Sequence, residues 1–128
     1  MKNLILLSAE LSTLSATENA ERSLWLATQL HNSGLTYERC EGCYCGAMET
    51  SYALPWDKRH ADAALCLGNL FEQESLLFVD EHGRATLGYL REPKIVPLGR
   101  LRKLERTTSV SNYTIYRGTF YTTESAGL

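Results

Sequence analysis

The 128-residue sequence has no long apolar run and no long run of one charge. A transmembrane helix needs about 18 or more consecutive apolar residues, and the apolar start at 4–7 is shorter than the core of a signal peptide. We therefore expect a protein without a membrane span, located in the cytoplasm. The net charge of -2 and the lack of a basic run give no electrostatic basis for binding nucleic acid.

Familiar catalytic and metal-binding motifs are also missing. The sequence has no Gly-x-Ser-x-Gly motif and no phosphate-binding loop, and none of its three histidines belongs to a recognisable catalytic-triad pattern. The thiolates of Cys40, Cys43 and Cys45 are a possible zinc set. However, no second Cys-x-x-Cys follows, and on a strand Cys40 would face away from Cys43. We therefore expect free thiols, no metal site and no cofactor.

The composition allows one folded domain. With 44% hydrophobic residues the chain can bury a core without metals or disulfides, and we assign residues 1–128 to a single domain. Four basic residues between 100 and 106 are interrupted by Glu105. We interpret them as a solvated face, with a phosphate site as the alternative.

Periodicity and capping signals predict alternating strands and helices. An apolar run predicts a buried strand at 4–8, and Ser15-x-x-Glu18 is a capping box for a helix that ends at Gly34. Asp57 can cap a second helix, within which Gly68 indicates close packing against a sheet. Further strands are predicted at 35–45, 48–54, 75–79, 84–90 and 113–123, and a short helix is one interpretation of the ambiguous segment 98–111.

This order of elements predicts a fold class. The pattern β-α-β-β-α-β with extra C-terminal strands is that of a ferredoxin-like α+β sandwich, whose helices cover one face of an antiparallel sheet. The strands also carry apolar residues for the other face. We therefore expect that face to be buried by another subunit, and the protein to be an oligomer.

The segment 41–52, Glu-Gly-Cys-Tyr-Cys-Gly-Ala-Met-Glu-Thr-Ser-Tyr, concentrates groups suited to chemistry. Glycines let a backbone approach a ligand closely or adopt φ > 0. Glu49 is a candidate functional carboxylate because apolar surroundings at a strand start would shift its pKa. The residues alone also allow a purely structural role for each of these side chains. Glu49 fits a surface position on a strand, and Tyr44 fits an ordinary aromatic of a core or an interface.

Short motifs spread over residues 4–124 recur in similar order in a known family. They are Ser8-Ala9, Glu18-Asn19, Arg22, Gly34-Leu35, Gly42-Cys43-Tyr44, Glu49, Glu72-Gln73-Glu74-Ser75-Leu76-Leu77 and Pro97-Leu98-Gly99. In these motifs the sequence resembles the small bacteriophage enzymes that degrade S-adenosylmethionine (SAM), first called SAM hydrolases and later SAM lyases.

The resemblance implies a ferredoxin-like homotrimer with active sites between subunits. It puts the key tyrosine of the family at Tyr44 and the key glutamate at Glu49, both as catalytic residues. The candidate substrate contacts are Gln73, Glu74, Ser51 and Ser8.

The resemblance also implies a reaction. In a lyase the carboxylate of SAM attacks its own Cγ, which releases 5′-methylthioadenosine and forms L-homoserine lactone. The site would exclude water and hold the chain in a reactive shape. Glu49 would bind the α-ammonium group, and Tyr44 would face the sulfonium.

Three alternatives stay open. One is a SAM hydrolase that gives homoserine, with Glu49 as general base. Another is a non-catalytic trimeric sensor that binds nucleotides or SAM. The last is a phage protein that acts against the host by binding a host partner.

Overall fold

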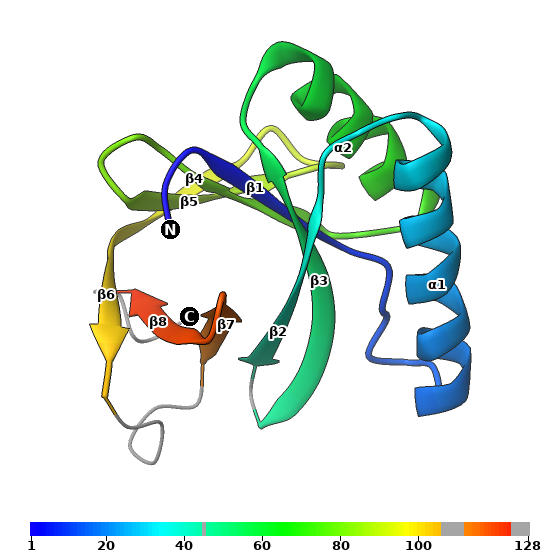
Figure 1. The fold of residues 1–128 in the computed structure, drawn as a ribbon, viewed down its shortest axis with the longest axis horizontal. Helices are drawn as coiled ribbons and strands as arrows, with labels where there is room; N and C mark the ends of the chain where they lie inside the picture. Colours follow the sequence, from blue (N-terminus) through cyan, green and yellow to red (C-terminus); the bar gives the residue numbers. More distant parts are fainter. Residues whose placement is uncertain (45, 106–111, 124–128) are drawn as a thin grey trace.

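The computed structural model describes residues 1–44, 46–105 and 112–123. In this part of the chain, strands form one closed antiparallel barrel with two helices packed on one side (Figure 1). The strands are β1 (Leu4–Ser8), β2 (Glu38–Tyr44), β3 (Ala47–Pro55), β4 (Ser75–Val79), β5 (Arg84–Tyr89), β6 (Ile95–Leu104), β7 (Tyr113–Tyr116) and β8 (Thr119–Thr123). The helices are α1 (Ala16–Asn32) and α2 (Lys58–Leu70).

The barrel shows that the ferredoxin-like prediction is wrong. The elements up to β4 do follow the predicted order β-α-β-β-α-β, with β1 between β3 and β4. The C-terminal strands, however, do not extend an open sheet. β5 pairs with β4, β7 pairs with β2, and β6 and β8 join these two ends. Both edges of the four-stranded unit are therefore paired, and the sheet closes on itself.

A bulge in β6 allows this closure. The register against β5 shifts between Ala85 and Thr86, with Leu98 as the extra residue on β6. The neighbouring Gly99 has φ of 84°, a conformation that glycine adopts without strain. A bulge bends and twists its strand. Beyond the bulge β6 stays paired with β5 as far as Arg100, which lies opposite Arg84, the first residue of β5, and from Leu101 onward it is paired with β8.

Two predictions for the C-terminal region are corrected by these strands. Residues 98–104 belong to β6 rather than to a short helix, and 106–111 lie outside the described residues. The bulge explains the error, because it lets Leu98 and Leu101, three positions apart, both line the interior as helix-spaced residues would. The strand predicted at 113–123 is a hairpin, whose turn residues Arg117 and Gly118 have φ of 50° and 77°.

The local signals for the helices are confirmed. Ser15 and Glu18 form the capping box of α1, and Asp57 caps α2. Gly34 follows α1 with φ of 67°. A Cβ on Gly68 would lie 2.8 Å from Cδ1 of Leu90, so α2 packs as closely as the glycine suggested. Within the described residues no helix is long and apolar enough to cross a membrane.

Alternation along the strands creates two separate cores. On β1, Ile5 and Leu7 face the helices, whereas Leu6 faces the barrel interior. The outer core lies between barrel and helices and includes Ile5, Leu7, Leu26, Leu30, Leu54, Ala64 and Leu76. The inner core fills one end of the barrel and consists of Leu6, Cys40, Ala53 and Val79.

The two cores change the argument for an oligomer. The sheet face that we expected a second subunit to bury is the inside of the barrel, where it is covered by the chain itself. The homotrimer therefore stays a prediction that rests on the family resemblance alone.

Candidate active site

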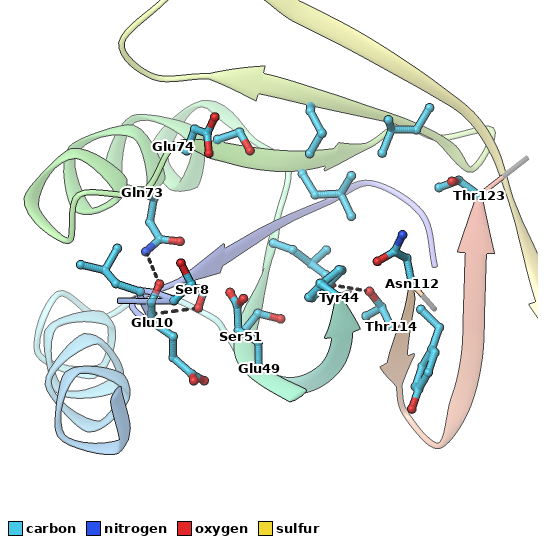
Figure 2. A pocket seen from close by; sticks show the side chains of 18 of the residues that line it. Ser8, Glu10, Tyr44, Glu49, Ser51, Gln73, Glu74, Asn112, Thr114 and Thr123 are labelled. Carbon is cyan, nitrogen blue, oxygen red and sulfur yellow. Dashed lines mark hydrogen bonds between the residues drawn. The ribbon is translucent and has the colours of Figure 1, made fainter. Parts of the chain in front are cut away.

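The barrel interior beyond the inner core opens into a cavity of about 710 Å³ (Figure 2). The strands that fill the inner core with apolar side chains continue into the cavity with polar ones, because every second residue of a strand points inward. On β1, Leu6 is followed by Ser8, and on β3, Ala53 is preceded by Ser51 and Glu49. The six predicted site residues all line this cavity: Ser8, Tyr44, Glu49, Ser51, Gln73 and Glu74.

Glu49 is a half-buried carboxylate near the start of β3. Burial raises its pKa above the ordinary value, and the negative charge of Glu10 adds to that rise. The nearby hydroxyl of Ser8 lowers this pKa and so opposes the rise, because it favours the ionised form. The apolar surroundings expected from the sequence are thus replaced by a mixed environment, in which a second carboxylate also acts on Glu49.

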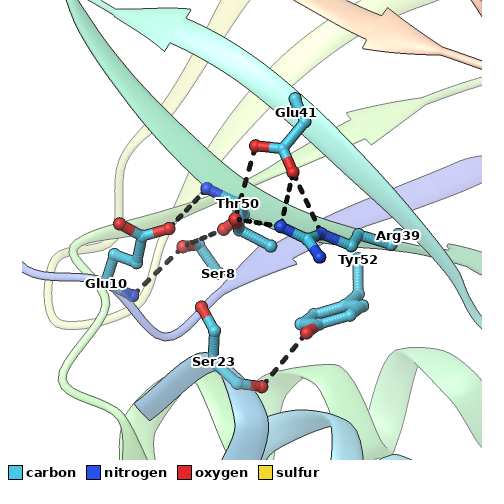
Figure 3. A network of polar contacts seen from close by, with 7 residues as sticks. All are labelled: Ser8, Glu10, Ser23, Arg39, Glu41, Thr50 and Tyr52. Atoms are coloured by element: carbon cyan, nitrogen blue, oxygen red, sulfur yellow. Dashed lines mark hydrogen bonds and ion pairs between the residues drawn. The ribbon is translucent and has the colours of Figure 1, made fainter. Parts of the chain in front are cut away.

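A hydrogen-bond network fixes the backbone beside Glu49 (Figure 3). The Ser8 hydroxyl donates to the carbonyl oxygen of Thr50 at 2.8 Å and accepts from the backbone N–H of Glu10 at 3.1 Å. The Glu10 carboxylate in turn accepts from the backbone N–H of Thr50. The backbone N–H and carbonyl of Thr50 are therefore both bonded to residues at the end of β1. These bonds fix the backbone position of the adjacent Glu49.

Gln73 is placed by the way α2 ends. The N–H groups of Glu72 and Gln73 bond the carbonyls of Asn69 and Gly68, and Glu72 has φ of 59°. This is a Schellman motif with Glu72 in the left-handed position, and it turns the chain toward the barrel. The Gln73 side chain is 8% exposed, and its amide nitrogen donates to the Glu10 carbonyl at 3.1 Å. Its oxygen end lies on the cavity side (Figure 2).

Arg22 of α1 joins the two chain segments that carry Glu10 and Gln73. Its Nε donates to the carbonyl of Ala9 at 2.6 Å, and its Nη2 donates to the carbonyl of Phe71 at 2.5 Å. The guanidinium also lies over the Phe71 ring, 5.5 Å from its centre. One arginine therefore sets the distance between two walls of the cavity.

Tyr44 stands on β2 with its hydroxyl 2.8 Å from Oγ1 of Thr114 on β7. Burial raises the pKa of Tyr44, while the hydrogen bond to Thr114 lowers it and the charge of Glu49 raises it further. The phenol is therefore neutral in the folded protein at ordinary pH. It can offer a ring face and a hydroxyl, but not a phenolate.

Ser51 carries an unsatisfied hydroxyl in the cavity wall. It is 5% exposed, and its Oγ has no hydrogen-bond partner within the described part of the chain. A buried hydroxyl without a partner costs free energy unless something satisfies it.

The cavity lining is acidic. Carboxylates come from Glu10, Glu49, Glu72 and Glu74. Among the described lining residues, the single side chain of lysine or arginine type is that of Arg91. The apolar part of the lining comes from leucines of β4, β5 and β6, namely Leu77, Leu87, Leu98 and Leu101. The cavity therefore suits a ligand with positive charge at one part and an apolar or flat surface at another.

Two residues of the cavity lining, Glu10 and Thr114, were not predicted from the sequence. Glu10 lies two positions after Ser8, so the alternation of β1 could have placed both on one face. Thr114 could not have been found, because it reaches Tyr44 only through the pairing of β2 with β7.

The three cysteines within the described residues, Cys40, Cys43 and Cys66, do not line the cavity. Cys40 belongs to the inner core, and burial raises the pKa of its thiol to about 11. Cys43, on the other face of β2, is half-buried, and Cys45 lies outside the described residues. In the described part of the chain no three histidine, cysteine or acidic side chains lie close enough together to hold a metal ion.

A model of the S-adenosylmethionine lyase family matches residues 5–124, almost the entire chain. The chain belongs to the S-adenosylmethionine lyase family. The resemblance found in the sequence motifs is thus confirmed, and the protein is an enzyme that acts on S-adenosylmethionine. Comparison with curated proteins found no match. The family assignment names the substrate, and the size and acidic lining of the cavity suit such a molecule.

Proposed function

We propose that the enzyme cleaves SAM in the barrel cavity to 5′-methylthioadenosine and L-homoserine lactone. The observation that supports this most is the acidic lining, which includes Glu10, Glu49 and Glu74, of a cavity of about 710 Å³. Cavities of roughly 300–1,000 Å³ are typical for small-molecule ligands. SAM carries a sulfonium, an ammonium and one carboxylate, so it is a net cation that such a lining attracts.

All bonds that form or break in this reaction belong to SAM, so no side chain of the enzyme reacts covalently. The carboxylate oxygen of SAM forms a bond to Cγ while the bond from Cγ to sulfur breaks, and the sulfur keeps the electron pair. Sulfonium and carboxylate thereby neutralise each other. A cavity that replaces water favours this change, because separated charges lose more from leaving water than the neutralised transition state does.

Glu49 is proposed to bind the α-ammonium group of SAM, with Ser51 and Gln73 as further partners. The ionised carboxylate makes a charge-assisted hydrogen bond, which is stronger than a neutral one. The unpaired Ser51 hydroxyl and the oxygen end of Gln73 supply acceptors nearby. Together they would turn the amino-acid end of SAM so that its carboxylate reaches Cγ, the entropic part of the catalysis.

Tyr44 is proposed to face the sulfonium. A cation over an aromatic ring gains about 0.5–2 kcal/mol, more where water is excluded. The neutral phenol held by Thr114 suits this role, because its ring stays fixed beside Glu49.

Hydrolysis is the second candidate, and the raised pKa of Glu49 is the observation that favours it. A carboxylate whose pKa is raised is a better general base toward a water molecule. The product would then be homoserine, formed without a lactone.

Incubation of the purified enzyme with SAM in water labelled with heavy oxygen separates these outcomes by mass spectrometry. Methylthioadenosine with unlabelled lactone at early times is the expected result. Labelled homoserine without a lactone precursor would instead establish the hydrolase. Unchanged SAM would contradict both and would favour a sensor that binds without turnover.

A further inference from the structure

Gly42 occupies the place of a missing side chain in the cavity wall. In the barrel register it is paired with Glu49 on β3 and with Thr114 on β7. Directly paired residues of neighbouring strands share a face, so these three lie side by side. Glu49 and Thr114 line the cavity, and Gly42 between them is buried but has no side chain to contribute.

The ring of Tyr44 fills the gap above Gly42. A Cβ built on Gly42 would lie 2.6 Å from both Cε2 and the hydroxyl oxygen of Tyr44, and 2.7 Å from Cζ. Two such atoms cannot approach so closely, so the ring can lie there only over a glycine. The backbone gives no other reason, because Gly42 is not among the described glycines with positive φ. A glycine inside a strand otherwise weakens it.

We infer that Gly42 and Thr114 are positioning residues that seat the Tyr44 ring beside Glu49 in the catalytic cavity. Gly42 provides the space for the ring, and the Thr114 hydroxyl holds the phenol oxygen at 2.8 Å. The inference rests on the proposed role of Tyr44 toward the sulfonium. It adds that the orientation of the ring is set by two neighbouring residues, which act on the reaction through Tyr44.

The variant Gly42→Ala should fold and lose turnover. The added methyl group meets the end of a side chain rather than backbone, so the ring moves and the barrel stays. Displacement of a reacting or orienting group by about 1 Å can cost on the order of 10²-fold in rate. We expect a loss of that order in kcat, with a smaller change in KM.

A double-mutant cycle with Tyr44→Ala tests whether the loss passes through the ring. If Gly42 serves only to seat Tyr44, then Gly42→Ala should cause no further loss in a Tyr44→Ala background. Gly88→Ala is the matched control, because its Cβ would lie 2.9 Å from Cε2 of Phe78 and Gly88 does not line the cavity. Its turnover per folded molecule should equal that of the wild type.

The hydroxyl of Thr114 is tested by a conservative pair. Thr114→Ser keeps the hydroxyl and should retain turnover near the wild-type level. Thr114→Val keeps the shape but loses the hydroxyl, and we expect a fall in kcat of roughly tenfold, which corresponds to one modest hydrogen bond.

A readout independent of turnover is the nuclear magnetic resonance signal of isotope-labelled tyrosine Cζ, with the Tyr44 signal assigned by its loss in Tyr44→Phe. The Tyr44 signal should shift in Gly42→Ala and Thr114→Val, and stay in Thr114→Ser and Gly88→Ala. An unmoved signal in Gly42→Ala would overturn the inference whatever the turnover. A shifted signal with unchanged turnover would instead overturn the catalytic role of Tyr44.

Discussion

The Glu10 carboxylate accepts a hydrogen bond from the backbone N–H of Thr50, the residue that follows Glu49 in β3. Glu10 therefore acts on Glu49 in two ways. Its hydrogen bond holds the backbone that carries Glu49, and its charge raises the Glu49 pKa. The two effects can be separated by substitution.

Glu10→Gln keeps an acceptor for the Thr50 N–H but removes the charge. The pKa of Glu49 should then fall, because the charge of Glu10 raises it in the wild type. If ionised Glu49 binds SAM, the acid limb of the pH profile of kcat/KM should move to lower pH. Glu10→Ala loses both effects and should lower kcat/KM by tenfold or somewhat more, about the value of a hydrogen bond to a charged group. An acid limb at the same pH in Glu10→Gln would contradict this coupling.

Glu49→Gln should stabilise the protein near neutral pH. Because the folded-state pKa of Glu49 is raised, mainly by burial, the ionised form is disfavoured in the folded protein. Protonated Glu49 therefore contributes stability that is fully present below the pKa of the unfolded chain, about 4.3. This contribution is lost as the pH rises through the higher pKa that Glu49 has in the folded protein. Urea unfolding should therefore show a gain for Glu49→Gln at pH 7 that vanishes at acid pH. The exposed Glu21→Gln is the control, and a less stable Glu49→Gln at pH 7 would be the opposite result.

Ser51→Ala should weaken SAM binding without loss of stability. The Ser51 hydroxyl has no partner within the described residues, so its removal breaks no internal hydrogen bond there. We expect a rise in KM of up to about tenfold, since a typical hydrogen bond contributes roughly 0.5–1.5 kcal/mol. Ser23→Ala removes the other such unpaired buried hydroxyl, away from the cavity, and should leave KM unchanged. Equal KM values for both variants would exclude Ser51 from the substrate site.

Arg22→Lys should destabilise the protein and impair the site. A lysine cannot reproduce the two diverging bonds to Ala9 and Phe71, and hydrogen bonds from charged groups contribute about 1.5–3 kcal/mol. Thermal or urea unfolding should report a loss of that size, and KM should rise because the walls that carry Glu10 and Gln73 loosen. Arg59→Lys is the control, because Arg59 also bonds two carbonyls but is exposed. Similar losses of unfolding free energy in both variants would contradict the role of Arg22 in holding the two cavity segments together.

The sequence predicted local structure well because its signals are local. Ser15, Asp57 and Gly34 act within a few residues of their own position, and α1 and α2 begin where these caps indicated. The candidate site residues were proposed mainly from the family resemblance, and local strand alternation explains why several of them face the same cavity. Strand alternation puts Ser8 on one face of β1 and both Glu49 and Ser51 on one face of β3, and the pairing of Ser8 with Ser51 brings these faces together.

The barrel could not be predicted because it depends on distant pairings and one irregular strand. Residue 42 on β2 and residue 114 on β7 are separated in the chain by four strands, β3 to β6, and nothing near either residue indicates the other. The bulge at Leu98 and Gly99 interrupts the alternation of β6 and gives it a helix-like spacing.

The most direct test of the central claim is the rate of methylthioadenosine formation from SAM by the wild type and by Glu49→Gln, each shown to be folded. We expect steady product from the wild type and a loss of on the order of 10²-fold or more in the variant, because an essential charge contact in the cavity is removed. Equal rates for the two proteins would contradict the assignment of the barrel cavity as the place where SAM is cleaved.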